Sequence, residues 1–401
     1  MRRDSRASAA IFILDEFLAG QNLNAILSRW AKSNRYAGSS DREAIRNIVF
    51  DILRVKKTFT FILRKEKQLT NGRALVFLYA VLHSMPLNDI FTGQKYGPDK
   101  LNVYEKEFFE IAKKNNDRGF ELVDNIPDFL IAEFKRSLRS KFNNVMRLLE
   151  KRAPVSIRVN TLKSDMSSIL EVLSLEGIEG KISQKVRYGI EIVGNPRRLT
   201  QIQIFKDGYF EVQDLHSQKI IEGLPINEDT NILDYCAGAG GKILGIACLL
   251  KGNGRFFVHD IDKNKLIEAD LRAERAGIKL KRFNSDNMQM HHNSFEYILA
   301  DVPCSGSGAW RRNPQQKWRI TPDSLKEILN RQITILNEVK DLVKKSGFLF
   351  YITCSFLKIE NEDVVDKFLI QNKNFSLSNK KNIFIDAHGD GFFCAALQKK
   401  N

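Results

Sequence analysis

Two cysteines near the ends of predicted strands are the residues of this chain best suited to chemistry. Cys304 lies in DVPCSGSG (301–308), and Cys354 lies in YITCS (351–355). A thiolate is a strong nucleophile, and two thiols placed over one substrate can form a covalent adduct and then dismantle it. The pair therefore predicts covalent chemistry on an electrophilic ring.

The other cysteines favour packing rather than a structural site. All five cysteines lie in the C-terminal half, their number is odd and no C-x-x-C pair occurs. This pattern argues against both a disulfide framework and a zinc site, so we expect no metal and a reducing cytoplasm. No segment reaches the roughly 20 consecutive apolar residues that span a bilayer, and we expect no membrane association.

Strands alternate with helices from about residue 208 onward. The predicted strands are NILDY (231–235), RFFVHD (255–260), LKRFNSD (280–286), YILAD (297–301) and FLFYIT (348–353). This alternation predicts a Rossmann-like α/β domain with a parallel sheet covered on both faces. Ligands in such folds bind beyond the carboxyl ends of the strands, where both cysteines are expected to lie.

The loop after the first of these strands, DYCAGAGGK (234–242), predicts a ligand without phosphates. Ile243 and Cys236 stand where a Walker A loop needs Ser or Thr and Gly, and Ile243 also replaces the third glycine of the dinucleotide fingerprint. Asp260, at the end of the second strand, is placed to accept hydrogen bonds from a ribose diol, and Asp286 to face an adenine edge. This spacing suits S-adenosylmethionine. The predicted cofactor residues are Cys236, Ala237, Gly238, Ala239, Gly240, Gly241, Lys242, Asp260 and Asp286.

The charge of the chain favours a polyanionic partner. Sixty-three Lys and Arg residues exceed 48 Asp and Glu residues, which gives a formal net charge of +15. The segment SGSGAWRRNPQQKWR (305–319) combines aromatic and basic residues, as is typical of contact with single-stranded nucleic acid. A solvated basic surface is the alternative. The predicted RNA-contacting residues are Trp310, Arg311, Arg312, Lys317, Trp318 and Arg319, with Arg158 and Asn160 as further candidates.

The periodicity divides the chain into three predicted domains. Residues 1–123 carry a helical pattern, including a predicted capping box at Ser40 and Glu43, and end near the polar stretch 113–119. Residues 124–207 predict a small α+β module with a helix at 127–150, a strand at 156–160 and a helix near 165–176. Residues 208–401 form the predicted α/β domain.

Several motifs together resemble the RsmB (Sun/Fmu) family of RNA cytosine-5 methyltransferases along nearly the whole chain. They are SIRVNTLK (156–163), GYFEVQDLHSQ (208–218), DYCAGAGGK, DVPCSGSG with RRNPQQKWR, YITCSFLKIENEDVV (351–365) and DGFFCAAL (390–397). The resemblance implies a class I methyltransferase domain and S-adenosylmethionine as cofactor. The helical N-terminus resembles the NusB-type RNA-binding domain of ribosomal RNA members, chiefly in SSDREAIRNIVFDILR (39–54).

The same resemblance implies a role for each reactive residue. Cys354 would add to carbon 6 of cytosine, so that carbon 5 becomes nucleophilic enough to take the methyl group. Cys304 would help remove the carbon 5 proton and release the product. Asp301 would hydrogen-bond the pyrimidine and lie at the edge of the cofactor site.

The sequence departs from the family pattern at three positions and leaves other functions open. Ala239 replaces a usual Pro, Ile243 replaces a Thr, and Gln315 stands where an acidic residue is commoner. We expect a monomer that methylates ribosomal RNA. The alternatives are a transfer RNA methyltransferase, a non-catalytic RNA-binding ribosome assembly factor, and a DNA cytosine methyltransferase with its nucleophile at Cys304.

Overall fold

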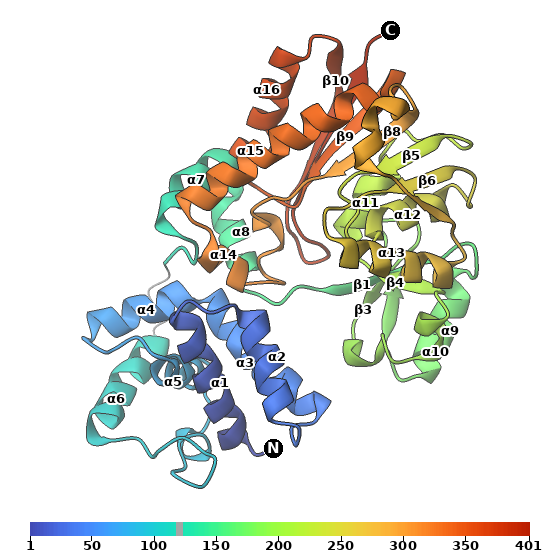
Figure 1. The fold of residues 1–401 in the computed structure, drawn as a ribbon. Coiled ribbons are helices and arrows are strands. Elements are labelled where there is room, and N and C mark those ends of the chain that lie inside the picture. Colours follow the sequence, from blue (N-terminus) through green and yellow to red (C-terminus); the bar gives the residue numbers. More distant parts are fainter. Residues whose placement is uncertain (118–122) are drawn as a thin grey trace. The chain divides into compact units, whose positions relative to one another are not determined.

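The computed structural model describes residues 1–117 and 123–401, which form two compact units (Figure 1). The helical unit comprises Met1–Ile131, Leu149–Arg152 and Trp310–Arg319, and the α/β unit comprises Ala132–Leu148, Ala153–Ala309 and Ile320–Asn401. Both units are therefore discontinuous in sequence. The three predicted domain boundaries stay a prediction, and residues 118 and 119 of the predicted polar stretch lie outside the described residues.

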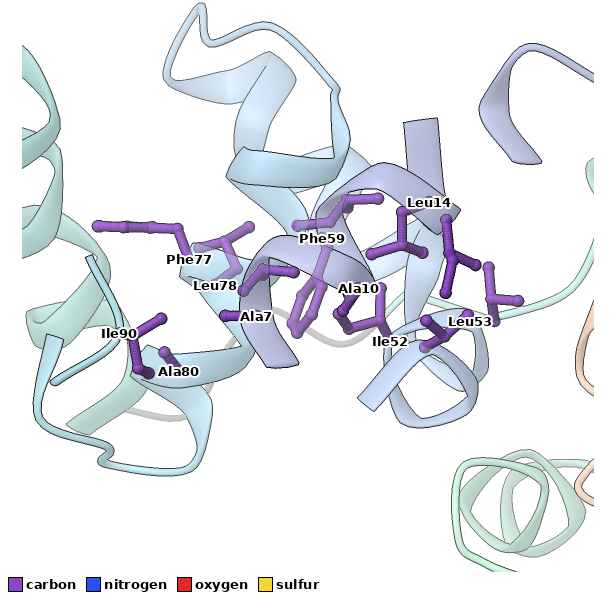
Figure 2. Packing of buried hydrophobic residues seen from close by; sticks show 14 of the residues in the cluster. Ala7, Ala10, Leu14, Ile52, Leu53, Phe59, Phe77, Leu78, Ala80 and Ile90 are labelled. Carbon is purple, nitrogen blue, oxygen red and sulfur yellow. The ribbon is translucent and has the colours of Figure 1, made fainter. Parts of the chain in front are cut away.

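The helical unit packs its helices around one apolar core (Figure 2). Its α-helices are α1 (Arg3–Leu18), α2 (Leu23–Ser33), α3 (Ser39–Arg54), α4 (Lys56–Lys65), α5 (Gly72–Leu82), α6 (Val103–Asp117) and α14 (Gln315–Arg319). In α3, Ile45, Val49 and Ile52 are buried, as their helical spacing predicts. The predicted capping box is wrong, because α3 begins at Ser39 after Gly38 and no side chain caps it. The resemblance to NusB stays a prediction.

A small antiparallel sheet forms the first part of the α/β unit. Its strands β1 (Val155–Val159), β2 (Gly180–Ile182), β3 (Gly189–Ile192) and β4 (Phe210–Val212) follow the order β2-β3-β1-β4. The helices of this region are α7 (Ile131–Leu138), α8 (Phe142–Leu149), α9 (Met166–Leu175) and α10 (Gln203–Lys206). The strand and the second helix predicted here are present. The single helix predicted over 127–150 is wrong, because a 3-10 turn with Arg139 at φ +50° separates α7 from α8.

A seven-stranded sheet forms the centre of the α/β unit, in the order β10-β11-β9-β8-β5-β6-β7. Its strands are β5 (Asn231–Asp234), β6 (Arg255–Val258), β7 (Leu280–Arg282), β8 (Phe295–Asp301), β9 (Val343–Thr353), β10 (Phe375–Ile383) and β11 (Phe392–Lys399). The five predicted strands are parallel, which confirms the Rossmann-like prediction. The sheet is not wholly parallel, because β11 pairs antiparallel with both β9 and β10.

Helices cover both faces of this sheet (Figure 1). Successive strand residues point to opposite faces, so each face presents apolar side chains that a layer of helices buries. Ile232 and Phe350 pack with α12 (Gly241–Leu249) and α13 (Lys263–Ala276). Leu233 and Leu349 pack on the other face with α15 (Pro322–Val339) and α16 (Glu362–Gln371). A further helix, α11 (Leu215–Glu222), precedes β5. None of the described helices has both the length and the apolar character that a membrane crossing requires.

The strand order reverses beside β5, which has β6 on one side and β8 on the other. In open α/β sheets a ligand crevice forms at such a point, beyond the carboxyl ends of the strands. The loops that follow β5, β8 and β9 all leave the sheet at this edge, because the three strands are parallel. These loops carry the glycine-rich segment and the two cysteines that the sequence predicts to be reactive.

Candidate active site

The two predicted reactive thiols lie side by side at the carboxyl edge of the sheet. β8 and β9 pair in parallel with Asp301 opposite Ile352, so the next few residues of both strands emerge together. The Sγ atoms of Cys304 and Cys354 are 3.4 Å apart, and both side chains are half-buried. This distance lets one thiol donate a hydrogen bond to the other sulfur.

The surroundings of Cys304 disfavour its ionised form. The hydrogen bond with Cys354 and burial raise the pKa of the Cys304 thiol well above its ordinary value. Cys304 therefore holds its proton and can donate it toward the sulfur of Cys354.

A buried carboxylate, Glu360, joins the two cysteine loops. Its Oε2 accepts hydrogen bonds from the hydroxyls of Ser305 and Ser355, each at 2.5 Å, and its Oε1 accepts from the backbone N–H of Ser305 at 2.7 Å. Gln332 donates to the same carboxylate at 3.3 Å. Each serine directly follows one reactive cysteine, so Glu360 fixes the relative position of the two thiols.

Sequence reasoning missed this role of Glu360. The available signal was the repeated Cys-Ser dipeptide, at 304–305 and 354–355, followed by an acid in ENE. An acid at the start of a helix is usually solvated, and its full burial becomes visible only in the fold. Burial raises the pKa of Glu360, while the bonds from Ser305 and Ser355 act in the opposite direction.

An ion pair connects the glycine-rich loop to the reactive loop. The ammonium of Lys242 binds the carboxylate of Asp301. Burial disfavours the charged ammonium, but the negative charges of Asp301 and Asp234 outweigh it and raise the pKa of Lys242. Burial and the charge of Asp301 raise the pKa of Asp234 to about 7. The Lys242 ammonium therefore places a positive charge close enough to Cys354 for the two groups to interact electrostatically.

The glycine-rich loop has the backbone conformation expected of a cofactor-binding loop. Gly238 and Gly240 have φ values of +52° and +79°, which favour glycine, and a Cβ on Gly238 would meet no atom within 4 Å. Asp260 accepts the Gly238 N–H at 2.8 Å and the Asp262 N–H at 2.9 Å. The open backbone and a fixed carboxylate, without the phosphate-loop residues, fit the amino acid and ribose parts of S-adenosylmethionine.

The remaining predicted cofactor residues lie on the same edge of the sheet. Residues 236–242 run from the end of β5 into α12, with Ala237 and Gly240 buried and the others partly exposed. Asp301 ends β8. Asp286 is exposed in the 3-10 segment after β7, and its backbone N–H binds the side chain of Asn284. The contact of Asp286 with adenine stays a prediction.

The structure contradicts RNA contacts for Arg158 and Asn160. Arg158 is buried and donates to the backbone carbonyl of Gly241 at 2.9 Å, beneath the cofactor loop. Asn160 is buried and donates to the carbonyls of Gly208 and Ala276 at 2.8 and 2.9 Å. Both side chains therefore stabilise the α/β unit instead of facing a nucleic acid.

The segment 310–319 belongs to the helical unit, and its burial contradicts three further predicted RNA contacts. Trp310, Arg311 and Lys317 are buried, and the ammonium of Lys317 donates to the carbonyl of Arg54 at 2.7 Å. Trp318 is half-buried and donates its indole N–H to the carbonyl of Leu53 at 2.7 Å. Arg312 is half-buried and Arg319 is exposed. RNA contact by Arg312, Trp318 and Arg319 stays a prediction.

Lys317→Met is expected to change the pH dependence of stability while leaving the salt dependence of RNA binding unchanged. Burial lowers the pKa of Lys317 from its ordinary value of 10.5 to about 7. At pH values between these two pKa values, the unfolded chain binds more protons than the folded chain. The folded state therefore becomes more stable as the pH rises from about 7 to about 10. The variant should lose this rise.

Thermal unfolding midpoints of both proteins at about pH 7 and about pH 9 measure the effect. Lys326→Met, at an exposed lysine, is the matched control and should keep the wild-type profile. If the stability of the wild-type and Lys317→Met proteins depends on pH in the same way, burial does not lower the pKa of Lys317.

Comparisons with known proteins match this chain to one family. A family model described as 16S rRNA methyltransferase RsmB/F matches residues 222–398, and a model described as an RsmF/B-like ferredoxin-like domain matches residues 126–197. The ribosomal RNA small subunit methyltransferase B of Photorhabdus laumondii is 30% identical over 290 residues, 68% of this chain and 66% of that relative. The probable methyltransferase B of Bacillus subtilis is 29% identical over 268 residues, 61% of this chain and 60% of its own length.

Solved structures show the same fold. The crystal structure of PH0851 aligns with a TM-score of 0.78 over 98% of this chain and 99% of that chain, at 22% identity. NSun6 from Pyrococcus horikoshii with SFG, an S-adenosylmethionine analogue, aligns with a TM-score of 0.62 over 70% of this chain and all of that chain, at 20% identity. The chain therefore belongs to the RsmB/F family of S-adenosylmethionine-dependent ribosomal RNA methyltransferases.

Proposed function

We propose that this enzyme methylates carbon 5 of cytosine in ribosomal RNA through a covalent adduct with Cys354. The observation that supports the proposal is the 3.4 Å separation of the two sulfurs at the edge of the sheet that also carries the cofactor loop. Addition to a pyrimidine and its later reversal need a nucleophile and a proton acceptor near the same ring. The two cysteines supply these two functions from adjacent strands.

The first half of the reaction uses Cys354. Its thiolate forms a bond to carbon 6 of cytosine, and the electron pair of the carbon 5–carbon 6 double bond becomes available at carbon 5. Asp301 hydrogen-bonds the pyrimidine and holds the ring, while its ion pair with Lys242 fixes the position of the carboxylate. S-Adenosylmethionine supplies the methyl group, which carbon 5 takes as the methyl–sulfur bond breaks.

The second half of the reaction releases the product. Cys304, after its thiol proton has passed to water, accepts the proton from carbon 5. The electron pair of that C–H bond re-forms the double bond to carbon 6, and Cys354 leaves as a thiolate. Cys304 lies 3.4 Å from the sulfur that would hold the ring, so its thiolate is placed to reach the carbon 5 proton.

Methyl transfer to transcribed small-subunit ribosomal RNA tests the proposal directly. The purified protein, labelled S-adenosylmethionine and the transcript are expected to yield 5-methylcytidine, identified by mass spectrometry of the nucleosides. Cys354→Ser is the inactive control, because its alcohol is a far weaker nucleophile than a thiolate. Methylation of a different atom would refute the proposed chemistry, and methylation of transfer RNA alone would replace the proposed substrate.

A further inference from the structure

A basic cavity of about 300 Å³ adjoins the reactive edge of the α/β unit. Ser355 and Phe356, the two residues after Cys354, line it, and so does Phe392 at the start of β11. The ring of Phe392 lies 5.6 Å from the ammonium of Lys242, which binds Asp301. The cavity and the proposed cytosine site therefore share a wall.

The lining of the basic cavity carries four cationic and two acidic side chains. Arg136 is neutralised by Glu133 and Asp363. The side chains of Lys358 and Lys380 make no ion pair within the two described ranges, 1–117 and 123–401, and Lys380 is exposed. Two ammonium groups are thus available to an anion that enters the cavity.

An aromatic surface accompanies these charges. The partly exposed ring of Phe384 lines the cavity and stacks on Phe356, with ring centroids 6.4 Å apart and an interplanar angle of 14°. The ammonium of Lys141 lies 3.8 Å from the centroid of the Phe384 ring, so a base that stacks on this ring would take the place of that ammonium. A flat ring among cations suits a nucleobase next to its phosphate, because bases stack on aromatic faces while phosphates bind ammonium groups.

We propose that the basic cavity binds the nucleotide that adjoins the target cytosine in single-stranded RNA, with its base on Phe384 and its phosphate at Lys358 and Lys380. This inference rests on the proposed function, because a cytosine at Cys354 is covalently joined to its neighbours. A cavity beside Cys354 must then hold part of the same strand. Its volume, at the lower end of the roughly 300–1,000 Å³ of small-ligand sites, suits one nucleotide.

The Lys358→Ala/Lys380→Ala double variant tests this site by RNA affinity, measured by fluorescence anisotropy with a labelled single-stranded oligoribonucleotide that contains cytosine. The substitution at Lys358 leaves its backbone N–H bonded to Ser137, so the loop keeps its anchor. Affinity should fall about ten-fold at low salt, and the salt slope should become shallower by about 0.7 for each phosphate that the protein no longer neutralises. KM for ribosomal RNA should rise while kcat at saturating RNA is retained.

The Lys326→Ala/Lys345→Ala variant removes two exposed lysines outside the cavity and is the matched control. Phe384→Ala should lower affinity about ten-fold without changing the salt slope, because stacking does not release counterions. Equal affinity and slope in the cavity and control variants would overturn the inference. So would loss of labelled polyglutamate binding in the cavity variant while oligoribonucleotide binding stays unchanged, which would assign the cavity to an acidic protein.

These outcomes are separable from a failure of the proposed function. Oligoribonucleotide binding is measured without methyl transfer, so it reports on the cavity by itself. A wild-type protein that makes no 5-methylcytidine would refute the proposed chemistry, whatever the salt slopes are. A wild-type protein that does make it, with unchanged binding in the cavity variant, would refute only the cavity.

Discussion

Cys304→Ala is expected to accumulate a covalent protein–RNA complex, whereas Cys354→Ala should form none. Without Cys304, the adduct still forms and takes the methyl group, but the carbon 5 proton is not removed and Cys354 is not expelled. Without Cys354, no bond to carbon 6 forms, and methyl transfer should fall at least about a thousand-fold. Denaturing gels with labelled ribosomal RNA and S-adenosylmethionine measure both results.

Cys394→Ala is the matched control for this pair. Cys394 is a buried cysteine in the core of the sheet and has no part in the proposed reaction. The Cys394→Ala protein should complete the methylation reaction and accumulate no covalent protein–RNA complex. A trapped complex with Cys354→Ala alone would reverse the assignment of the two thiols, and a complex with neither variant would refute the adduct.

Glu360→Ala is expected to destabilise the protein and to lower kcat more than it changes KM. The substitution leaves the two serine hydroxyls and the Ser305 N–H without their buried acceptor. We expect a loss of about 3 kcal/mol in the free energy of unfolding, since each buried donor left without an acceptor costs about 1–3 kcal/mol. A small shift between the thiols should lower kcat about a hundred-fold.

Glu360→Gln separates positioning from stability. The amide keeps one carbonyl acceptor, so this variant should fold better than Glu360→Ala and recover part of kcat. Glu327→Ala, at an exposed glutamate of α15, is the control and should change neither quantity. Urea unfolding and the rate of methyl transfer are the two measurements. A folded Glu360→Ala protein with wild-type kcat would show that the carboxylate does not position the thiols.

The sequence was sufficient to predict the five parallel strands and to place the two cysteines at their carboxyl edge. Alternating strands and helices require parallel neighbours, and parallel strands bring their carboxyl ends to one edge. Residues after β5, β8 and β9 were therefore expected at one edge of the sheet, whereas the position of β8 between β5 and β9 came from the structure. The antiparallel pair β10 and β11 was missed, because β10 is largely exposed and polar and lacks the apolar pattern of a buried strand.

Only the tertiary structure decided which basic and aromatic residues are available to RNA. Arg158, Trp310, Arg311 and Lys317 have the side chains of a nucleic-acid site, yet all four are buried. Composition reports the chemistry of a side chain, whereas burial depends on residues far away in sequence, such as the Arg54 carbonyl that binds Lys317. The same dependence on distant partners hid Glu360, whose serines lie 55 and 5 residues away along the chain. Local pattern thus predicted the five parallel strands and the position of the two cysteines, and long-range packing determined the groups that hold those cysteines.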